Sequence, residues 1–93
     1  MALQTTVALL RLALAKIAET AYGSVPDVIP VVVIGDQGDR HFAVSIPAQC
    51  RDSVYAYIAA RLSLAVDFSN EPLILSPQQA AAVVQIGLEL GSR

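Results

Sequence analysis

The chain has 93 residues, of which 55% are apolar and 15% are charged, and its formal net charge is -2 at pH 7. This size indicates a single domain, residues 1–93, and the composition excludes intrinsic disorder, which requires low hydrophobicity and high charge. Six basic residues are scattered along the sequence and oppose eight acidic ones, so they form no cationic stripe. We therefore expect no nucleic-acid partner.

The cysteine content and the first residues of the chain bear on its location. Cys50 is the only cysteine, so the chain cannot form an internal disulfide and we expect it in the reducing cytoplasm. Residues 7–15 are nearly all apolar and end in Ala-Leu-Ala, which resembles a signal-peptidase site. However, no basic residue precedes this run and Arg11 interrupts it. The run is also shorter than the roughly 20 apolar residues of a membrane span, so we expect neither a signal peptide nor a span.

Residues 2–22 have the periodicity of an amphipathic helix. Six apolar residues recur at alternating spacings of four and three, which places them on one stripe: Leu3, Val7, Leu10, Leu14, Ile17 and Ala21. Gly23 is expected to end the helix in a left-handed conformation, and Pro26 and Pro30 then favour an extended linker.

Two β-rich segments follow and predict an antiparallel hairpin. Residues 31–34 are all β-branched, whereas residues 41–46 alternate and place Phe42, Val44 and Ile46 on one face. Because residues 31–34 are apolar on both faces, we expect this strand to be central in the sheet or covered.

The second half of the chain predicts a helix, a short strand and another helix. Residues 48–64 carry a broad apolar face, and residues 72–75 predict a strand at the edge of the sheet because of Pro72. Ser76, Pro77 and Gln79 form a helix-start signal in which serine caps the helix and glutamine completes a capping box. The third helix is expected to run to Leu90.

The predicted order is helix, strand, strand, helix, strand, helix. This order indicates an α+β domain with three helices on a small, mostly antiparallel three-stranded sheet, made of the hairpin and one short strand. A chain of this size buries only about 60 to 65% of its unfolded surface, so such a sheet shields few apolar helix faces.

More apolar helix surface is present than this fold can cover. Leu9 and Leu12 project opposite the main stripe of the first helix, and Val84 and Leu88 lie on a second apolar stripe of the third helix. Contiguous apolar patches usually mark interaction sites, so these four residues predict an interface, with a homodimer as the default assembly. Alternatively, scattered surface leucines are normal, and the fifteen alanines raise the apolar fraction without forming an adhesive surface.

Arg61 is a further candidate for this interface because it falls within the apolar face of the second helix. Its side chain can lay its methylene groups along the core and lift its charged end into water. The other possibility is that it faces a partner chain and pairs there with a carboxylate.

One polar cluster contains groups that could carry chemistry: Asp36, Asp39, His41 and Cys50. Glycine and aspartate at 35–39 are also what a hairpin turn requires, and the ligand spacing matches neither a calcium loop nor a histidine pair, so we expect no metal or other cofactor. Cys50 near a helix start and His41 could form a nucleophile and base, but the position of Cys50 on an apolar face favours a packed thiol.

Three functional hypotheses remain from the sequence. The first is a non-enzymatic, oligomeric protein that binds another protein through the first and third helices. The second is a regulatory module that holds a small apolar ligand between the helices and the sheet. The third is an enzyme that uses Cys50 and His41.

Overall fold

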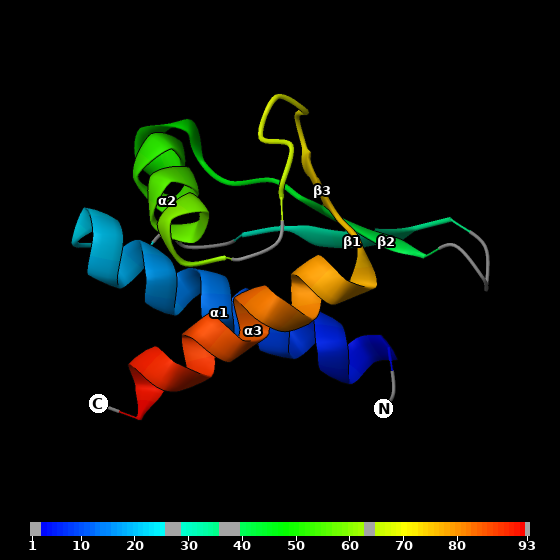
Figure 1. Ribbon diagram of the computed structural model, residues 1–93, viewed down its shortest axis with the longest axis horizontal. Helices are drawn as coiled ribbons and strands as arrows, with labels where there is room; N and C mark the ends of the chain where they lie inside the picture. Colours follow the sequence, from blue (N-terminus) through cyan, green and yellow to red (C-terminus); the bar gives the residue numbers. More distant parts are fainter. Residues whose placement is uncertain (1–2, 26–28, 36–39, 63–64, 93) are drawn as a thin grey trace.

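A computed structural model describes residues 3–25, 29–35, 40–62 and 65–92 (Figure 1). Over these residues the chain forms three helices and one three-stranded sheet in the expected order. The elements are α1 (Leu3–Tyr22), β1 (Val31–Ile34), β2 (His41–Val44), α2 (Ala48–Arg61), β3 (Leu73–Leu75) and α3 (Pro77–Gly91). The predicted α+β class is confirmed. In the described ranges, no helix is both long enough and apolar enough to cross a bilayer.

The sheet is antiparallel throughout, with strand order β1-β2-β3. Its inner face carries apolar side chains from every strand, and α1 and α3 pack against it (Figure 1). The register of the strands explains why this face is apolar. Residues that lie opposite one another on neighbouring strands point to the same face of the sheet. The inward-facing residues are Val31, Val33, Phe42, Val44, Leu73 and Leu75.

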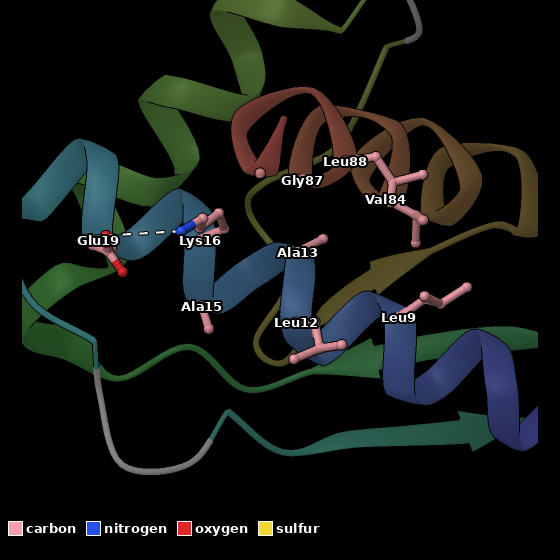
Figure 2. A pocket seen from close by; sticks show the side chains of 10 residues that line it. Leu9, Leu12, Ala13, Ala15, Lys16, Glu19, Val84, Gly87 and Leu88 are labelled. Atoms are coloured by element: carbon pink, nitrogen blue, oxygen red, sulfur yellow. Dashed lines mark ion pairs between the residues drawn. The ribbon is translucent and has the colours of Figure 1, made fainter. Parts of the chain in front are cut away.

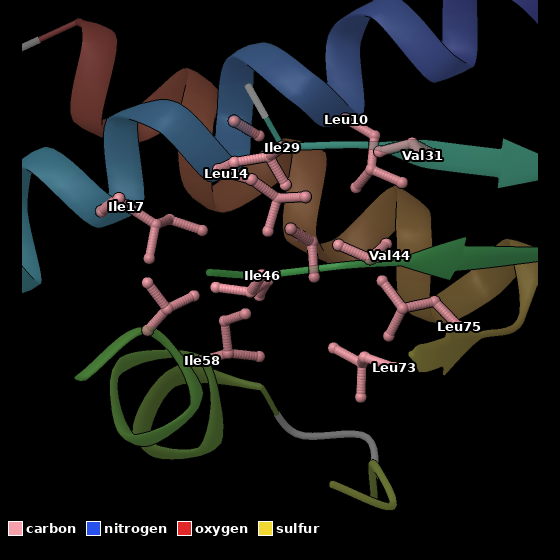
Figure 3. Packing of buried hydrophobic residues seen from close by; sticks show 14 of the residues in the cluster. Leu10, Leu14, Ile17, Ile29, Val31, Val44, Ile46, Ile58, Leu73 and Leu75 are labelled. Carbon is pink, nitrogen blue, oxygen red and sulfur yellow. The ribbon is translucent and has the colours of Figure 1, made fainter. Parts of the chain in front are cut away.

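The core lies between this face and the helices (Figure 3). Leu10, Leu14 and Ile17 of α1 are fully buried, as the stripe of fours and threes predicts. Gly23 ends α1 with a φ of +97°, a left-handed conformation that favours glycine.

The starts of α2 and α3 differ in how they are capped. At α3, the Ser76 hydroxyl accepts a hydrogen bond from the Gln79 backbone N–H, and the Gln79 side chain accepts one from the Ser76 N–H, which confirms the predicted capping box. Pro47 is the N-cap of α2 and makes no side-chain cap. The C-terminal end of α2 comes earlier than residue 64, because Leu62 takes an extended conformation.

The expectation that the strand at 31–34 is central or covered is wrong. β1 is an edge strand, and its outward side chains Val32 and Ile34 are 57% and 41% exposed. The predicted edge position of β3 is confirmed. A run of apolar residues on both faces does not by itself show that a strand has neighbours on both sides.

Candidate functional site

α1 and α3 cross at a point where both helices carry small residues. A Cβ atom built on Gly87 of α3 would lie 2.4 Å from the Cβ of Ala13 and 2.5 Å from its Cα. Both residues are buried, so the two backbones are in direct contact there. Only glycine at position 87 permits this approach, and the crossing fixes how the remaining side chains of both helices are arranged.

A groove lies along this crossing on the outer side of the two helices (Figure 2). Its volume is about 340 Å³, and besides Ala13 and Gly87 it is lined by Leu9, Leu12, Ala15, Lys16, Glu19, Val84, Leu88 and Gly91. Leu12 and Leu88 contribute from opposite helices and are 68% and 56% exposed. The groove is therefore apolar and open to solvent.

The structure brings together four of the five residues predicted for an interface. Leu9, Leu12, Val84 and Leu88 all line the groove, and we call these four residues the α1/α3 face. The predicted exposure is confirmed in full for Leu12 and Leu88, whereas Leu9 and Val84 are half-buried. Their being an interface stays a prediction.

Arg61 does not line the groove. Its guanidinium carbon lies 3.4 Å from the centre of the Tyr57 ring, one turn earlier on α2, and its Nη1 donates a hydrogen bond to the Tyr57 carbonyl oxygen at 3.4 Å. A cation over a tyrosine face is attracted by the ring quadrupole, which accounts for its place on the surface. The structure thus separates Arg61 from the other four residues.

Charge at the groove is confined to one pair. Lys16 Nζ and Glu19 Oε1 lie 3.9 Å apart on successive turns of α1, and both side chains are about half exposed (Figure 2). Such an exposed pair contributes little to stability. The pair instead makes one end of the groove polar, because it places a positive and a negative group side by side in an otherwise apolar lining.

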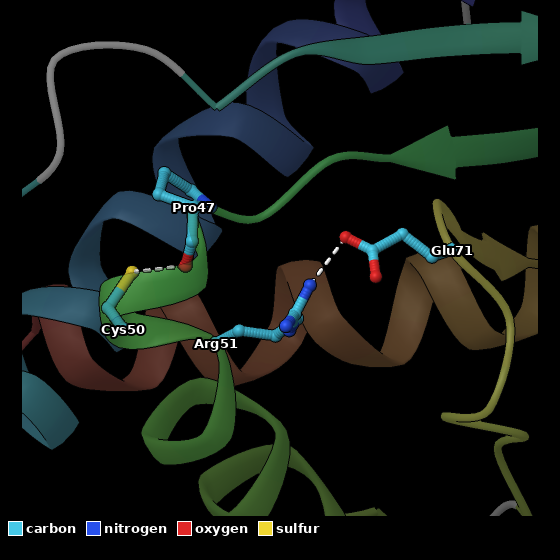
Figure 4. Close-up of polar contacts among 4 residues, drawn as sticks. All are labelled: Pro47, Cys50, Arg51 and Glu71. Atoms are coloured by element: carbon cyan, nitrogen blue, oxygen red, sulfur yellow. Dashed lines mark hydrogen bonds and ion pairs between the residues drawn. The ribbon is translucent and has the colours of Figure 1, made fainter.

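The polar cluster predicted around the hairpin is only partly visible. Asp36 and Asp39 lie outside the described residues, and His41 is half-buried at the start of β2. Cys50 is 1% exposed, and its thiol donates a weak hydrogen bond to the Pro47 carbonyl oxygen at 3.6 Å (Figure 4). A thiol packed in this way lacks the access to solvent that a nucleophile requires.

Metal coordination finds no support in the described ranges. No group of three or more His, Cys, Asp or Glu side chains there is placed to hold an ion. The same residues contain no buried polar or charged side chain. Cys50 is the one ionisable side chain buried in the described core.

Two polar contacts fasten the segment before β3. Arg51 of α2 donates to Glu71 in an ion pair (Figure 4), and the amide of Gln79 donates to the Ala65 carbonyl oxygen at 2.7 Å. Near them, the rings of Tyr55 and Phe68 stack with centres 4.9 Å apart. The pKa of Tyr55 is raised, chiefly because the phenol is partly buried. The positive charge of Arg51 lowers this pKa, and the negative charges of Glu71 and Asp52 raise it. The ion pair, the hydrogen bond and the ring contact together hold residues 65–72 against α2 and α3.

A turn in the same segment is organised by Asp67. The Ser69 hydroxyl donates a hydrogen bond of 2.5 Å to the Asp67 carboxylate, and the Ser69 backbone N–H donates another of 2.9 Å. These two bonds lower the pKa of Asp67, the hydroxyl contributing more than the backbone. An aspartate that bonds its own backbone two residues on is typical of a turn, so this carboxylate is structural.

Sequence reasoning missed the two residues that make the groove possible. Ala13 belongs to no predicted site, and Gly87 was not singled out within the third helix. A signal was present, because a glycine inside an apolar helix costs stability and commonly marks a close packing contact. The sequence does not say which helix makes that contact.

Comparisons of this chain with protein-family models, curated proteins and solved structures found no match. Any functional conclusion therefore rests on the geometry of the α1/α3 face.

Proposed function

We propose that this chain is a non-enzymatic protein-interaction module that forms a homodimer through the α1/α3 face. The observation that carries the proposal is the pair of exposed leucines, Leu12 and Leu88, one from each helix, at a single groove. Complete burial of a leucine side chain stabilises an assembly by about 1.5–3 kcal/mol. Two such side chains beside a groove with small residues at its base provide a centre for an interface.

A second copy of the chain is the occupant that suits this surface. The face carries both a protruding apolar side chain, Leu12, and a groove that could receive one. A surface with both features offers each copy a side chain to insert and a groove to receive one about a twofold axis, which is the commonest symmetry of homo-oligomers. Lys16 and Glu19 carry opposite charges, so the groove has no net charge that would repel a second copy.

The competing functions have less support. A small apolar ligand in this groove would remain largely exposed, whereas ligand sites usually enclose most of the ligand. A cysteine enzyme would need a reactive thiol, and Cys50 is buried. The buried, unpaired thiol supports the proposal that the protein works in the reducing cytoplasm.

The test is the mass of the protein in solution. We expect sedimentation velocity to show self-association of the wild-type chain at tens of micromolar, and Leu12→Glu to weaken it at least about tenfold because the interface would bury a carboxylate in place of an apolar side chain. Leu12 is exposed, so circular dichroism should show an unchanged fold. Val25→Glu is the matched control, because Val25 is 48% exposed and does not line the groove.

Two results would contradict the proposal. One is a wild-type protein that remains monomeric at tens of micromolar. The other is a Leu12→Glu variant that associates as strongly as the wild type and the Val25→Glu control.

A further inference from the structure

The hydrogen-bond pattern of the sheet identifies which backbone groups of β1 face outward. The Ser45 N–H donates to the Pro30 carbonyl oxygen at 3.0 Å, so Pro30 and Ser45 form a hydrogen-bonded pair. In an antiparallel ladder such pairs alternate with non-hydrogen-bonded pairs. Val32 opposite Ala43 is therefore hydrogen-bonded, whereas Val31 opposite Val44 and Val33 opposite Phe42 are not.

It follows that the N–H and C=O groups of Val31 and Val33 point away from β2, toward the free edge of the sheet. Within the described part of the chain, no hydrogen bond outside the strand ladders ends on either residue. An edge of this kind is a template for another extended strand. The outward N–H and C=O groups select the occupant, because only a β-strand presents donors and acceptors at the same spacing.

The two edges of this sheet differ in how well they are protected. At β3, Pro72 precedes the strand and has no N–H to offer, and the charges of Glu71 and Arg51 lie beside it (Figure 4). Prolines and charges are the usual means of blocking an edge. β1 has neither among its four residues, and the missing N–H of Pro30 falls on the side of β2 rather than on the free edge.

The side chains of β1 also resemble those of an interior strand. Val31 points into the core (Figure 3), and Val32 and Ile34 expose apolar surface on the opposite side of the sheet. A strand that is apolar on both faces is typical of a position where both faces of the sheet are covered. The outer face of β1 instead leaves apolar surface in water, which the side chains of a neighbouring strand would partly cover.

We infer that β1 pairs antiparallel with β1 of a second copy of this chain, which joins the two sheets into one of six strands. About a twofold axis through Val32, Val31 lies opposite Val33 of the partner subunit, and Val33 lies opposite Val31 of the partner subunit. Both are hydrogen-bonded pairs, so every outward group of these two residues is satisfied. The two copies of Val32 then face each other as a close, non-hydrogen-bonded pair.

A second copy is the occupant because the edge is complementary to itself. One register satisfies the donors and acceptors of both strands and places the uncharged, β-branched side chains side by side. This contact is separate from the α1/α3 face, since no residue of β1 lines the groove. It can form whether or not that face is an interface, and a chain that used both twofold contacts would assemble beyond a dimer.

Amide hydrogen exchange of the wild-type protein tests the pairing without any substitution. We expect the Val31 and Val33 amides to exchange at least about tenfold more slowly at millimolar than at low micromolar concentration, because only the second copy protects them. The Ala43 amide, which donates within the ladder, should be protected at both concentrations. Fast exchange of the Val31 and Val33 amides at every concentration would overturn the proposal, and so would protection that does not depend on concentration.

A pair of variants at one position tests the backbone contribution separately. Val33→Pro removes an N–H that points to the free edge and leaves the β1–β2 hydrogen bonds in place. Val33→Ala shortens the same side chain and keeps the N–H. Both are made in the Leu12→Glu background, so association through the α1/α3 face does not contribute. We expect sedimentation velocity to show dimers for Val33→Ala and monomers for Val33→Pro, and equal association of the two would overturn the pairing.

Discussion

Gly87 sets the distance between α1 and α3. With a Cβ atom at this position, the nearest atoms of Ala13 would include a backbone Cα at 2.5 Å, which no side-chain rotation can move away. The helices would have to separate by shifting their backbones, and the groove would change with them. One residue without a side chain therefore fixes the geometry of the α1/α3 face.

We predict that Gly87→Ala destabilises the protein although alanine is the better helix former. Alanine favours a helix interior over glycine by about 1 kcal/mol, but overpacking in a tight core costs about 1–3 kcal/mol, and the clash here involves backbone. The expected net loss in the free energy of unfolding is about 1–2 kcal/mol, measured by urea denaturation.

Gly91→Ala in the same helix provides the control for this prediction. A Cβ atom at Gly91 has no other heavy atom within 4 Å, so this variant should be neutral or stabilised by up to about 1 kcal/mol. If both alanine variants gave the same change, the close crossing at Gly87 would not be the reason for the glycine.

At the scale of single elements, the local signals of the sequence were reliable. The stripe through Leu10, Leu14 and Ile17 predicted the buried side of α1, and Ser76 predicted the start of α3. These signals succeed because a helix stripe and a cap are set by residues three or four positions apart. No comparable local signal in the sequence predicted that α2 ends at Arg61.

Contacts between elements could not be predicted in the same way. The sequence shows that residues 31–34 are apolar on both faces, but not that a neighbouring strand is absent on one side. It shows a glycine at position 87, but not that Ala13 lies against it. In both cases the missing information is a tertiary pairing between residues far apart in the chain, which periodicity does not encode.

The capping box of α3 gives a prediction at this scale. Ser76→Ala removes the hydroxyl that accepts from the Gln79 N–H and should lower the free energy of unfolding by about 0.5–2 kcal/mol, as measured by urea denaturation. Ser92→Ala at the other end of α3 is the matched control, because Ser92 is exposed and its hydroxyl only donates to the Glu89 carbonyl oxygen. Equal losses for both serines would contradict a specific role for the cap.

At the scale of the whole molecule, the two proposed contacts draw on the same property. The apolar core is fully formed inside one chain, yet Leu12 and Leu88 on one side and Val32 and Ile34 on another remain exposed. The α1/α3 face relies on side chains that leave water, and the β1 edge relies on backbone groups that gain partners. Because these forces differ, substitutions can remove one contact and leave the other.

This gives a last prediction, in which stability depends on protein concentration. Folded copies that associate are stabilised by mass action, and a tenfold rise in concentration adds about 1.4 kcal/mol per mole of dimer. For a dimer of two chains of this size, that corresponds to a rise in Tm of about 3–6 °C.

The variants should separate the contributions to this shift. Leu12→Glu alone and Val33→Pro alone should each retain a concentration-dependent Tm in differential scanning calorimetry, because each leaves one contact intact. The double variant should melt at the same temperature at 10-fold different concentrations, within about 1 °C. A wild-type Tm that is independent of concentration would remove the basis for both contacts, whereas loss of the shift in only one single variant would assign self-association to that contact alone.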